Sequence, residues 1–217
     1  MKKENITFII GCAVVIGLCA LLTVFIKNSN KDSNKTNSGE QEVVEKDENL
    51  LSGKHYVQIS VKGYGKIDLE LDADIAPISV TNFINLASEG FYDGLTFHRI
   101  MEGFMIQGGG YEKDGSRKPA NNIKGEFSLN GVNNTLSHKR GVISMARADA
   151  YNSASSEFFI MHADYPSLDG RYAAFGYVTK GIEVVDKIVK KAKPTDNNGS
   201  ISIDERPVIE YIKVIEK

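Results

Sequence analysis

The chain has 217 residues, with 26 basic and 28 acidic side chains and a formal net charge of −2. A chain of this length accommodates one ordinary domain and an additional segment. Its basic residues are scattered among acidic ones and form no stripe, so the composition excludes nucleic acid as an expected partner.

The first element is an apolar segment at residues 6–26, which carries no charge and follows Lys2 and Lys3. It is long enough to cross a bilayer as a helix and longer than the apolar region of a cleaved signal peptide. A buried core helix would show a polar face, and this segment has none. The pattern predicts a transmembrane signal anchor at 6–26, with residues 1–5 in the cytoplasm and the remainder of the chain outside.

The next segment, residues 27–52, is rich in Asn, Ser, Lys and Glu and contains no aromatic residue. Such a composition cannot bury enough apolar surface to fold, so we expect a disordered polar linker. A flexible coil of this length spans about 28 Å on average. The linker would therefore hold the folded part, residues 53–217, close to a membrane surface.

Two strands around a glycine-rich turn are expected at 55–72, because apolar and polar residues alternate on each side of the turn. A helix is expected in "APISVTNFINLASEG" (76–90), where Pro77 suits the first turn and Gly90 ends the helix. The apolar residues of this segment fall on one helical face: Val80, Phe83, Ile84 and Ala87.

A second helix fits "GIEVVDKIVKKA" (181–192), and the tail at 201–217 resembles a closing strand. Short apolar runs separated by Gly, Asn and Asp indicate further strands at 97–101, 104–107, 142–146, 157–162 and 172–178. Many short strands with only two helices favour an antiparallel barrel or sandwich capped by the helices.

The chain shows no motif that would hold a cofactor or metal. "GGG" at 108–110 leads into no helix, and no G-x-S-x-G elbow is present. Both cysteines, Cys12 and Cys19, lie within the apolar segment, so they supply neither a disulfide framework nor a nucleophile for the folded part. The four histidines lack metal-ligand spacing: His55, His98, His138 and His162.

The segment "FHRIMEGFMIQGGG" (97–110) places Arg99 among apolar residues, where an unpaired guanidinium is costly. If the segment forms a hairpin with a three-residue loop, Arg99 lies opposite Gln107 and Met101 opposite Met105. A two-residue loop would place Arg99 opposite Ile106 instead, without a partner. An arginine at the end of a strand often only extends to solvent or pairs with an acid.

Four blocks carry a resemblance to a known family: "FHRIMEGFMIQGGG", "GVISMARA", "NSASSEFFI" and "SLDGRYAAFGYV". In this order, together with "PISVTNFINLASEGFYDGLTFHR", they resemble the cyclophilin family of peptidyl-prolyl cis-trans isomerases over about residues 55–217. The resemblance implies a mainly β fold, an eight-stranded antiparallel barrel capped by two α-helices. It also implies isomerase activity on proline-containing polypeptides without a metal or cofactor.

The resemblance implies a role for particular residues. Arg99 matches the catalytic arginine, and Gln107 with the backbone of Ala146 and Arg147 would bind the peptide. Tyr172 stands where many members carry His, while His98 would be a packed structural residue. The apolar pocket for the proline ring would be formed by Phe104, Met105, Phe159 and Leu168.

Two positions depart from the family pattern. Glu157 stands in the substrate-binding region where members usually carry Gln, and its carboxylate could pair with Arg99, either steadying or partly neutralising it. Ser167 stands where eukaryotic members often carry Trp, and the chain has no Trp at all. The resemblance therefore implies weak binding of cyclosporin.

The chemistry of the reaction explains an arginine in apolar surroundings. Amide resonance blocks rotation about the peptide bond by roughly 18–20 kcal/mol, and X-Pro isomers exchange over tens to hundreds of seconds. Arg99 can hydrogen-bond the proline nitrogen as resonance is lost, and apolar surroundings strengthen that bond. We therefore predict an isomerase in the cell membrane, with a single span and an extracytoplasmic catalytic domain, acting on unfolded or secreted polypeptides.

Two other functions compete with this prediction. A proline-peptide binding module or chaperone with incidental catalysis would keep the pocket but would not need Arg99. A membrane-tethered structural or adhesion domain that uses the barrel only as a scaffold would lose the pocket residues as well.

Overall fold

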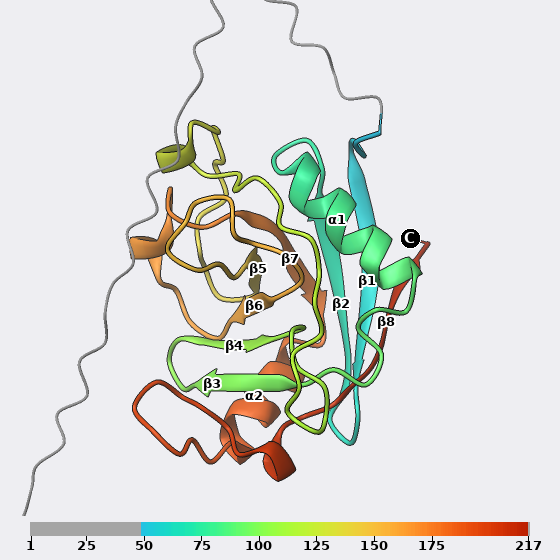
Figure 1. Ribbon diagram of the computed structural model, residues 1–217, viewed down its shortest axis with the longest axis vertical. Helices are drawn as coiled ribbons and strands as arrows, with labels where there is room; N and C mark the ends of the chain where they lie inside the picture. The colour runs from blue at the N-terminus through green and yellow to red at the C-terminus, as the bar shows by residue number, and fades with distance from the viewer. Residues whose placement is uncertain (1–48, 217) are drawn as a thin grey trace, which may run out of the picture. The chain divides into compact units, whose positions relative to one another are not determined.

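The computed structural model describes residues 49–216. Its elements are β1 (Lys54–Val61), β2 (Gly65–Asp72), α1 (Pro77–Ser88), β3 (Phe97–Met101), β4 (Met105–Gly108), β5 (Val142–Met145), β6 (Phe158–Met161), β7 (Ala174–Lys180), α2 (Ile182–Lys191) and β8 (Ile209–Ile215) (Figure 1). The predicted cytoplasmic segment 1–5, the anchor 6–26 and most of the linker 27–52 lie outside the described residues. Among residues 49–216, no helix has the length and apolar character needed to cross a membrane.

All eight strands belong to one antiparallel sheet, in the order β3-β4-β6-β5-β7-β2-β1-β8. The strands at the two ends of this order meet through an isolated bridge between Thr96 and Val208. The Phe97 N–H also donates a 2.9 Å hydrogen bond to the Pro207 carbonyl. The sheet therefore curls until its edges are joined, which confirms the mainly β fold with eight antiparallel strands and two helices.

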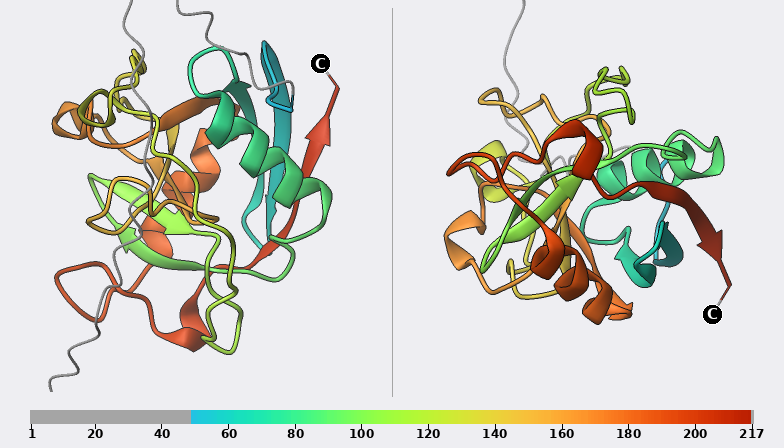
Figure 2. Two further views of the ribbon diagram at one scale, coloured as in Figure 1. Left: turned by 45° about the horizontal axis from the view of Figure 1, so that its top comes forward. Right: turned by 90° about the horizontal axis from the view of Figure 1, so that it is seen from below.

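Helix α1 contacts β8 and β2, α2 contacts β2, and Figure 2 shows the two helices apart from each other with strands between them. The buried face of α1 contains the predicted residues with Ser79 added: Ser79, Val80, Phe83, Ile84 and Ala87. The N-terminus of α1 lacks a local side-chain cap. Glu126 supplies one from a distant loop, because its carboxylate accepts from the Ile78 and Ser79 N–H groups at 2.9 and 2.7 Å.

The tail differs from the prediction of a strand over 201–217. A short 3₁₀ turn occupies Ile203–Glu205, and β8 begins only at Ile209. Pro207 lies between them and has no N–H to donate to a ladder, so it marks the place where pairing can start. Leu51, which the prediction placed in the linker, packs against the core and donates its N–H to the Thr81 hydroxyl at 2.9 Å.

The hairpin of β3 and β4 decides the position of Arg99. Arg99 pairs with Gln107 and Met101 with Met105, so the three-residue-loop alternative is confirmed. The register slips between Phe97 and Arg99, which makes His98 the extra residue of a bulge.

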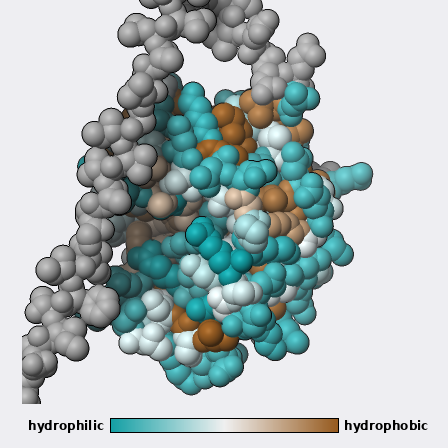
Figure 3. Space-filling model, in the orientation of Figure 1, coloured by the Kyte–Doolittle hydropathy of each residue, from teal (hydrophilic) through white to brown (hydrophobic). Residues whose placement is uncertain are grey.

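On the face of the domain shown in Figure 3, hydrophilic residues predominate around scattered hydrophobic ones.

Candidate active site

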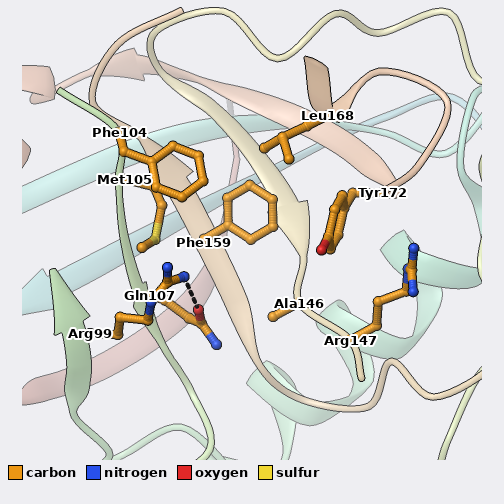
Figure 4. A pocket seen from close by; sticks show the side chains of 9 residues that line it. All are labelled: Arg99, Phe104, Met105, Gln107, Ala146, Arg147, Phe159, Leu168 and Tyr172. Atoms are coloured by element: carbon orange, nitrogen blue, oxygen red, sulfur yellow. Dashed lines mark hydrogen bonds between the residues drawn. The ribbon is translucent and has the colours of Figure 1, made fainter. Parts of the chain in front are cut away.

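A cavity of about 120 Å³ lies over the sheet where β3, β4 and β6 run side by side (Figure 4). It collects all but one of the residues predicted for the site, although they come from segments far apart in the sequence. Its lining is Arg99, Phe104, Met105, Gln107, Ala146, Arg147, Phe159, Leu168 and Tyr172. The remaining predicted residue, Glu157, lies behind Gln107 in a neighbouring cavity.

The floor of the cavity is apolar and separate from the main core. Met105 and Phe159 are buried within a small apolar cluster, against which Phe104, Leu168 and Tyr172 pack. The Phe159 and Tyr172 rings meet edge to face, with centroids 5.9 Å apart. Such a floor can receive a small apolar ring and exclude water from it.

A buried hydrogen-bonded group supports this floor from behind. The His138 ring stacks on Phe159 with centroids 6.0 Å apart. Its Nδ1 lies 2.8 Å from Asp169 Oδ1 and its Nε2 lies 3.0 Å from the Ser144 hydroxyl. Burial lowers the pKa of His138, although the neighbouring Asp169 raises it in part. Because both ring nitrogens have partners, the ring is held in one orientation, and Phe159 rests on a fixed support.

Arg99 lies at the rim of the cavity, half-buried, with its guanidinium held on three sides. Its Nε donates to the Asn198 carbonyl at 2.7 Å, its Nη1 to Gln107 Oε1 at 3.2 Å and its Nη2 to Met101 Sδ at 3.2 Å. The Phe104 ring centroid lies 5.8 Å from Cζ. A guanidinium has five N–H groups, so two of them have no acceptor within residues 49–216 and can serve a bound peptide.

Burial lowers the pKa of Arg99, and Tyr172 and Asp196 offset part of this effect. The side chain nevertheless stays charged at neutral pH, because an arginine starts from a pKa far above it. No carboxylate forms an ion pair with Arg99 in the part of the chain that the structure describes. Its hydrogen-bonding capacity is therefore not committed to a counter-ion.

The loop that contains Asn198 was not among the predicted site residues. Asp196 Oδ1 accepts from the N–H groups of Asn198 and Ser200 at 2.9 and 3.0 Å, which forms a tight turn. Gly199 adopts a positive φ of 83°, and a Cβ there would lie 2.5 Å from Met101 Cγ. The run of Asp, Asn and Gly in this loop is typical of a turn and could have predicted one. It could not have predicted that the turn contacts β3.

Glu157 does not pair with Arg99, so the pairing considered from the sequence is wrong. Its Oε2 accepts from Gln107 Nε2 at 3.0 Å, and its Oε1 lies 3.4 Å from Arg117 Nη2. His98 Nε2 lies 3.5 Å from the same carboxylate. The interpretation failed because Gln107 occupies the place between the guanidinium and the carboxylate.

His98 packs against Tyr111, with ring centroids 4.6 Å apart, and does not line the cavity. Burial lowers the pKa of His98 to about 4, and the positive charges of Arg206, Arg99 and Arg117 add to this effect. Among residues 49–216, no three His, Cys, Asp or Glu side chains gather into a group that could hold a metal ion.

Arg147 forms the wall on the side opposite Arg99 (Figure 4). Its Nε and Nη2 donate to the Arg171 carbonyl at 3.0 and 2.9 Å. Three aromatic rings surround the guanidinium, with centroids 4.8 to 5.3 Å from Cζ: Phe127, Tyr151 and Tyr172. The Ala146 N–H already donates to the Glu157 carbonyl at 2.9 Å, which leaves the Ala146 carbonyl for a peptide.

Ser167 is exposed in an open depression that continues from the cavity past Leu168 and Tyr172. Leu129 and Tyr151 also line this depression and are among the exposed large apolar residues of the domain. An aromatic side chain at position 167 would therefore extend the apolar surface beside the cavity.

The model of the family described as "Cyclophilin type peptidyl-prolyl cis-trans isomerase/CLD" matches residues 56–216. The chain belongs to the cyclophilin family. Peptidyl-prolyl cis-trans isomerase A of Dickeya dadantii is 44% identical to this cyclophilin over 161 residues, which cover 70% of the chain and 81% of that protein. Peptidyl-prolyl cis-trans isomerase B of Bacillus subtilis is 45% identical over 118 residues, covering 54% and 79% respectively.

Solved structures agree with this assignment. A crystal structure of a Cryptosporidium parvum cyclophilin-type isomerase matches with a TM-score of 0.62 and 27% identity, covering 76% of this chain and 99% of that one. The same protein in the presence of the dipeptide Ala-Pro matches with a TM-score of 0.61 and 27% identity. This cyclophilin is accordingly a peptidyl-prolyl cis-trans isomerase, as the sequence resemblance implied.

Proposed function

We propose that this isomerase acts outside the cell membrane on unfolded or secreted polypeptides, with Arg99 as the catalytic donor at the proline nitrogen. The observation that carries the catalytic part of the proposal is the position of the guanidinium. It is fixed by Asn198, Gln107 and Met101 at the rim of an apolar cavity, with two N–H groups still available.

The reaction neither makes nor breaks a covalent bond, so catalysis must stabilise the twisted amide relative to both planar forms. In the twisted amide the nitrogen is pyramidal and carries a lone pair, which accepts a hydrogen bond that the planar amide cannot. With the proline ring held on Met105 and Phe159, an Arg99 N–H would donate to that lone pair. A donor that is already oriented needs no reorganisation during the reaction, and dry surroundings strengthen its bond.

The remaining predicted residues have supporting roles in this proposal. Phe104 and Leu168 close the sides of the ring pocket, and Tyr172 packs edge to face against Phe159. Gln107 and the backbone at Ala146 and Arg147 would hold the peptide on either side of the proline. The lining supplies binding and a hydrogen-bond donor, and the mechanism uses nothing else.

The proposed location rests on the sequence alone, through the apolar segment 6–26 and the polar linker 27–52. A domain tethered there would meet secreted chains as they emerge unfolded, while their X-Pro bonds are still a mixture of isomers. The substrates would then be proline-containing polypeptides that emerge from this membrane, whatever their other sequence features.

The catalytic role of Arg99 is tested by measuring the isomerisation rate of a short X-Pro peptide by exchange NMR. The full chain is compared with two variants. Arg99→Ala should lower turnover about 10²–10³-fold, by analogy with removal of one oriented donor. Arg99→Lys keeps the charge but not the planar fork, so it should also lose most of the activity. Near-native turnover in a folded Arg99→Ala protein would instead favour the proline-peptide binding module.

A further inference from the structure

Arg99 and Glu157 are linked through Gln107 without touching each other. Arg99 Nη1 donates to Gln107 Oε1 at 3.2 Å, and Gln107 Nε2 donates to Glu157 Oε2 at 3.0 Å. Gln107 lies opposite Arg99 on β3 and opposite Phe159 on β6, so it is in the middle of the site. The orientation of its amide therefore matters for the guanidinium.

The chemistry of the two neighbours leaves that amide one orientation. A guanidinium has donors and no acceptor, and an ionised carboxylate has acceptors and no donor. Gln107 must therefore turn its oxygen toward Arg99 and its NH₂ group toward Glu157. With Gln at position 157, either end of that second amide could face Gln107, and the orientation would no longer be imposed.

The side chain of Glu157 is largely buried, and its neighbours leave space for it. Its side chain is 14% exposed, and Arg117 Nη2 and His98 Nε2 lie 3.4 and 3.5 Å from its oxygens. Gly110 leaves the space that the side chain fills, since a Cβ on Gly110 would lie 2.4 Å from Glu157 Cγ. The φ of Gly110 is not in the left-handed region, so its lack of a side chain serves this contact and not a turn.

We propose that Glu157 is a positioning residue of the isomerase, which fixes the Gln107 amide so that its oxygen anchors Arg99. The proposal rests on the proposed role of Arg99 as the donor to the proline nitrogen. Glu157 touches neither the apolar floor nor, in this geometry, the reacting amide. It acts by preventing Gln107 from presenting its NH₂ group to the guanidinium, which would push Arg99 out of place.

The first experiment replaces the carboxylate in the purified full chain and measures kcat and KM on an X-Pro peptide. Glu157→Leu removes the acceptor and should lower kcat about tenfold, the value of a hydrogen bond to a charged group. Glu157→Gln keeps an acceptor without imposing the orientation, so its loss should be about two- to threefold. Glu112→Gln removes a negative charge from the loop after β4, outside the site, and should leave kcat unchanged.

A spectroscopic readout separates positioning from a general loss of structure. In the wild type, the Gln107 side-chain amide protons and the Arg99 Nε proton should give single, slowly exchanging NMR signals. Glu157→Leu should broaden or move both signals while the backbone spectrum away from the site persists. Unchanged signals of both side chains in Glu157→Leu would overturn the proposal.

A second test displaces the carboxylate without removing it. Gly110→Ala places a methyl group where Glu157 Cγ lies and should lower kcat several-fold, in the range of one displaced hydrogen bond. In the Glu157→Ala background that space is empty, so Gly110→Ala should cause no further loss. Equal losses in the two backgrounds would show that Gly110 acts on something other than Glu157, and would overturn the proposal.

The outcomes distinguish this proposal from the one on which it rests. If Arg99→Ala is inactive while Glu157→Leu matches the wild type in kcat, the donor role stands and the positioning role of Glu157 falls. If Arg99→Ala is nearly as active as the wild type, the donor role falls whatever the Glu157 variants do. A faster Glu157→Gln protein would also contradict the positioning role, because it would mean that the carboxylate restrains Arg99.

Discussion

Arg99 and Asn198 are 99 residues apart in the sequence, yet Arg99 Nε donates a 2.7 Å hydrogen bond to the Asn198 carbonyl. The bond joins the strand that carries the guanidinium to a loop near the end of the chain. It is the shortest of the three hydrogen bonds that hold the guanidinium. The direction of the proposed catalytic donor is therefore set partly by a loop outside the cavity.

A methyl group at Gly199 should disturb this bond. Gly199→Ala would place Cβ 2.5 Å from Met101 Cγ and 2.6 Å from the Ile100 carbonyl, so the loop must move away from β3. We expect turnover to fall several-fold and the free energy of unfolding to fall by more than the ~1 kcal/mol that positive φ costs Ala. Isomerase rates and urea unfolding measure the two effects.

Gly131→Ala is the matched control for that variant. Gly131 has a similar φ of 77°, but apart from its chain neighbours no atom of residues 49–216 lies within 4 Å of a Cβ placed there, and it does not line the cavity. It should therefore show the backbone cost alone, with unchanged turnover. Equal turnover in the two variants would mean that the Asn198 loop does not position Arg99.

Folding stability should depend on pH through His98. Its pKa is about 4 in the folded chain against an ordinary value of 6.5. Between these two values the unfolded chain binds a proton at this side chain and the folded chain does not. The stabilisation is complete above pH 6.5 and is lost as the pH falls toward 4, by at most about 3 kcal/mol. Urea unfolding of the wild type and of His98→Gln between pH 7 and 4.5 should show a shallower decline in the variant; parallel declines would contradict this assignment.

The full chain should fractionate with membranes, because an apolar segment such as 6–26 is held by burial and not by charge. Detergent should release it and high salt should not. A variant that lacks residues 6–26 should appear in the soluble fraction. Protease added to intact cells should remove the isomerase domain; a domain that resists it while the envelope admits the protease would reverse the proposed topology.

Cyclosporin should inhibit the wild-type enzyme only weakly. In family members with Trp at the position of Ser167, the indole is implied to cover part of the cyclic peptide, and an aromatic ring can bury about 150–250 Å². Ser167 lies in the depression beside Leu168 and Tyr172, outside the cavity that holds Arg99. Ser167→Trp should therefore tighten inhibition by an order of magnitude or more, and change turnover much less.

The test is a cyclosporin titration of both proteins during the isomerase assay. Tight inhibition of the wild type would contradict the expected weakness. No gain in Ser167→Trp would mean that position 167 does not face the ligand.

Periodicity within single segments predicted the two helices and most of the strands, although the closing strand predicted over 201–217 begins only at Ile209. The apolar face of α1 and the alternation of β1 and β2 are local patterns, and each is decided by a few neighbouring residues. The β3–β4 hairpin was predictable to within two registers, because the loop length was the only open question. The family blocks then named the cavity residues, and all but Glu157 line one cavity.

Tertiary structure alone decided the contacts that orient those residues. In the sequence, Gln107 and Glu157 are 50 residues apart, and Arg117 and Glu157 are 40 residues apart. Arg99 and Asn198, which are also in contact, are separated by 99 residues. Local propensity carries no information about such pairs, since each partner is equally compatible with its own segment when the other is absent. The sequence by itself therefore determined which chemistry is present, while the curled sheet determined which donor faces which acceptor.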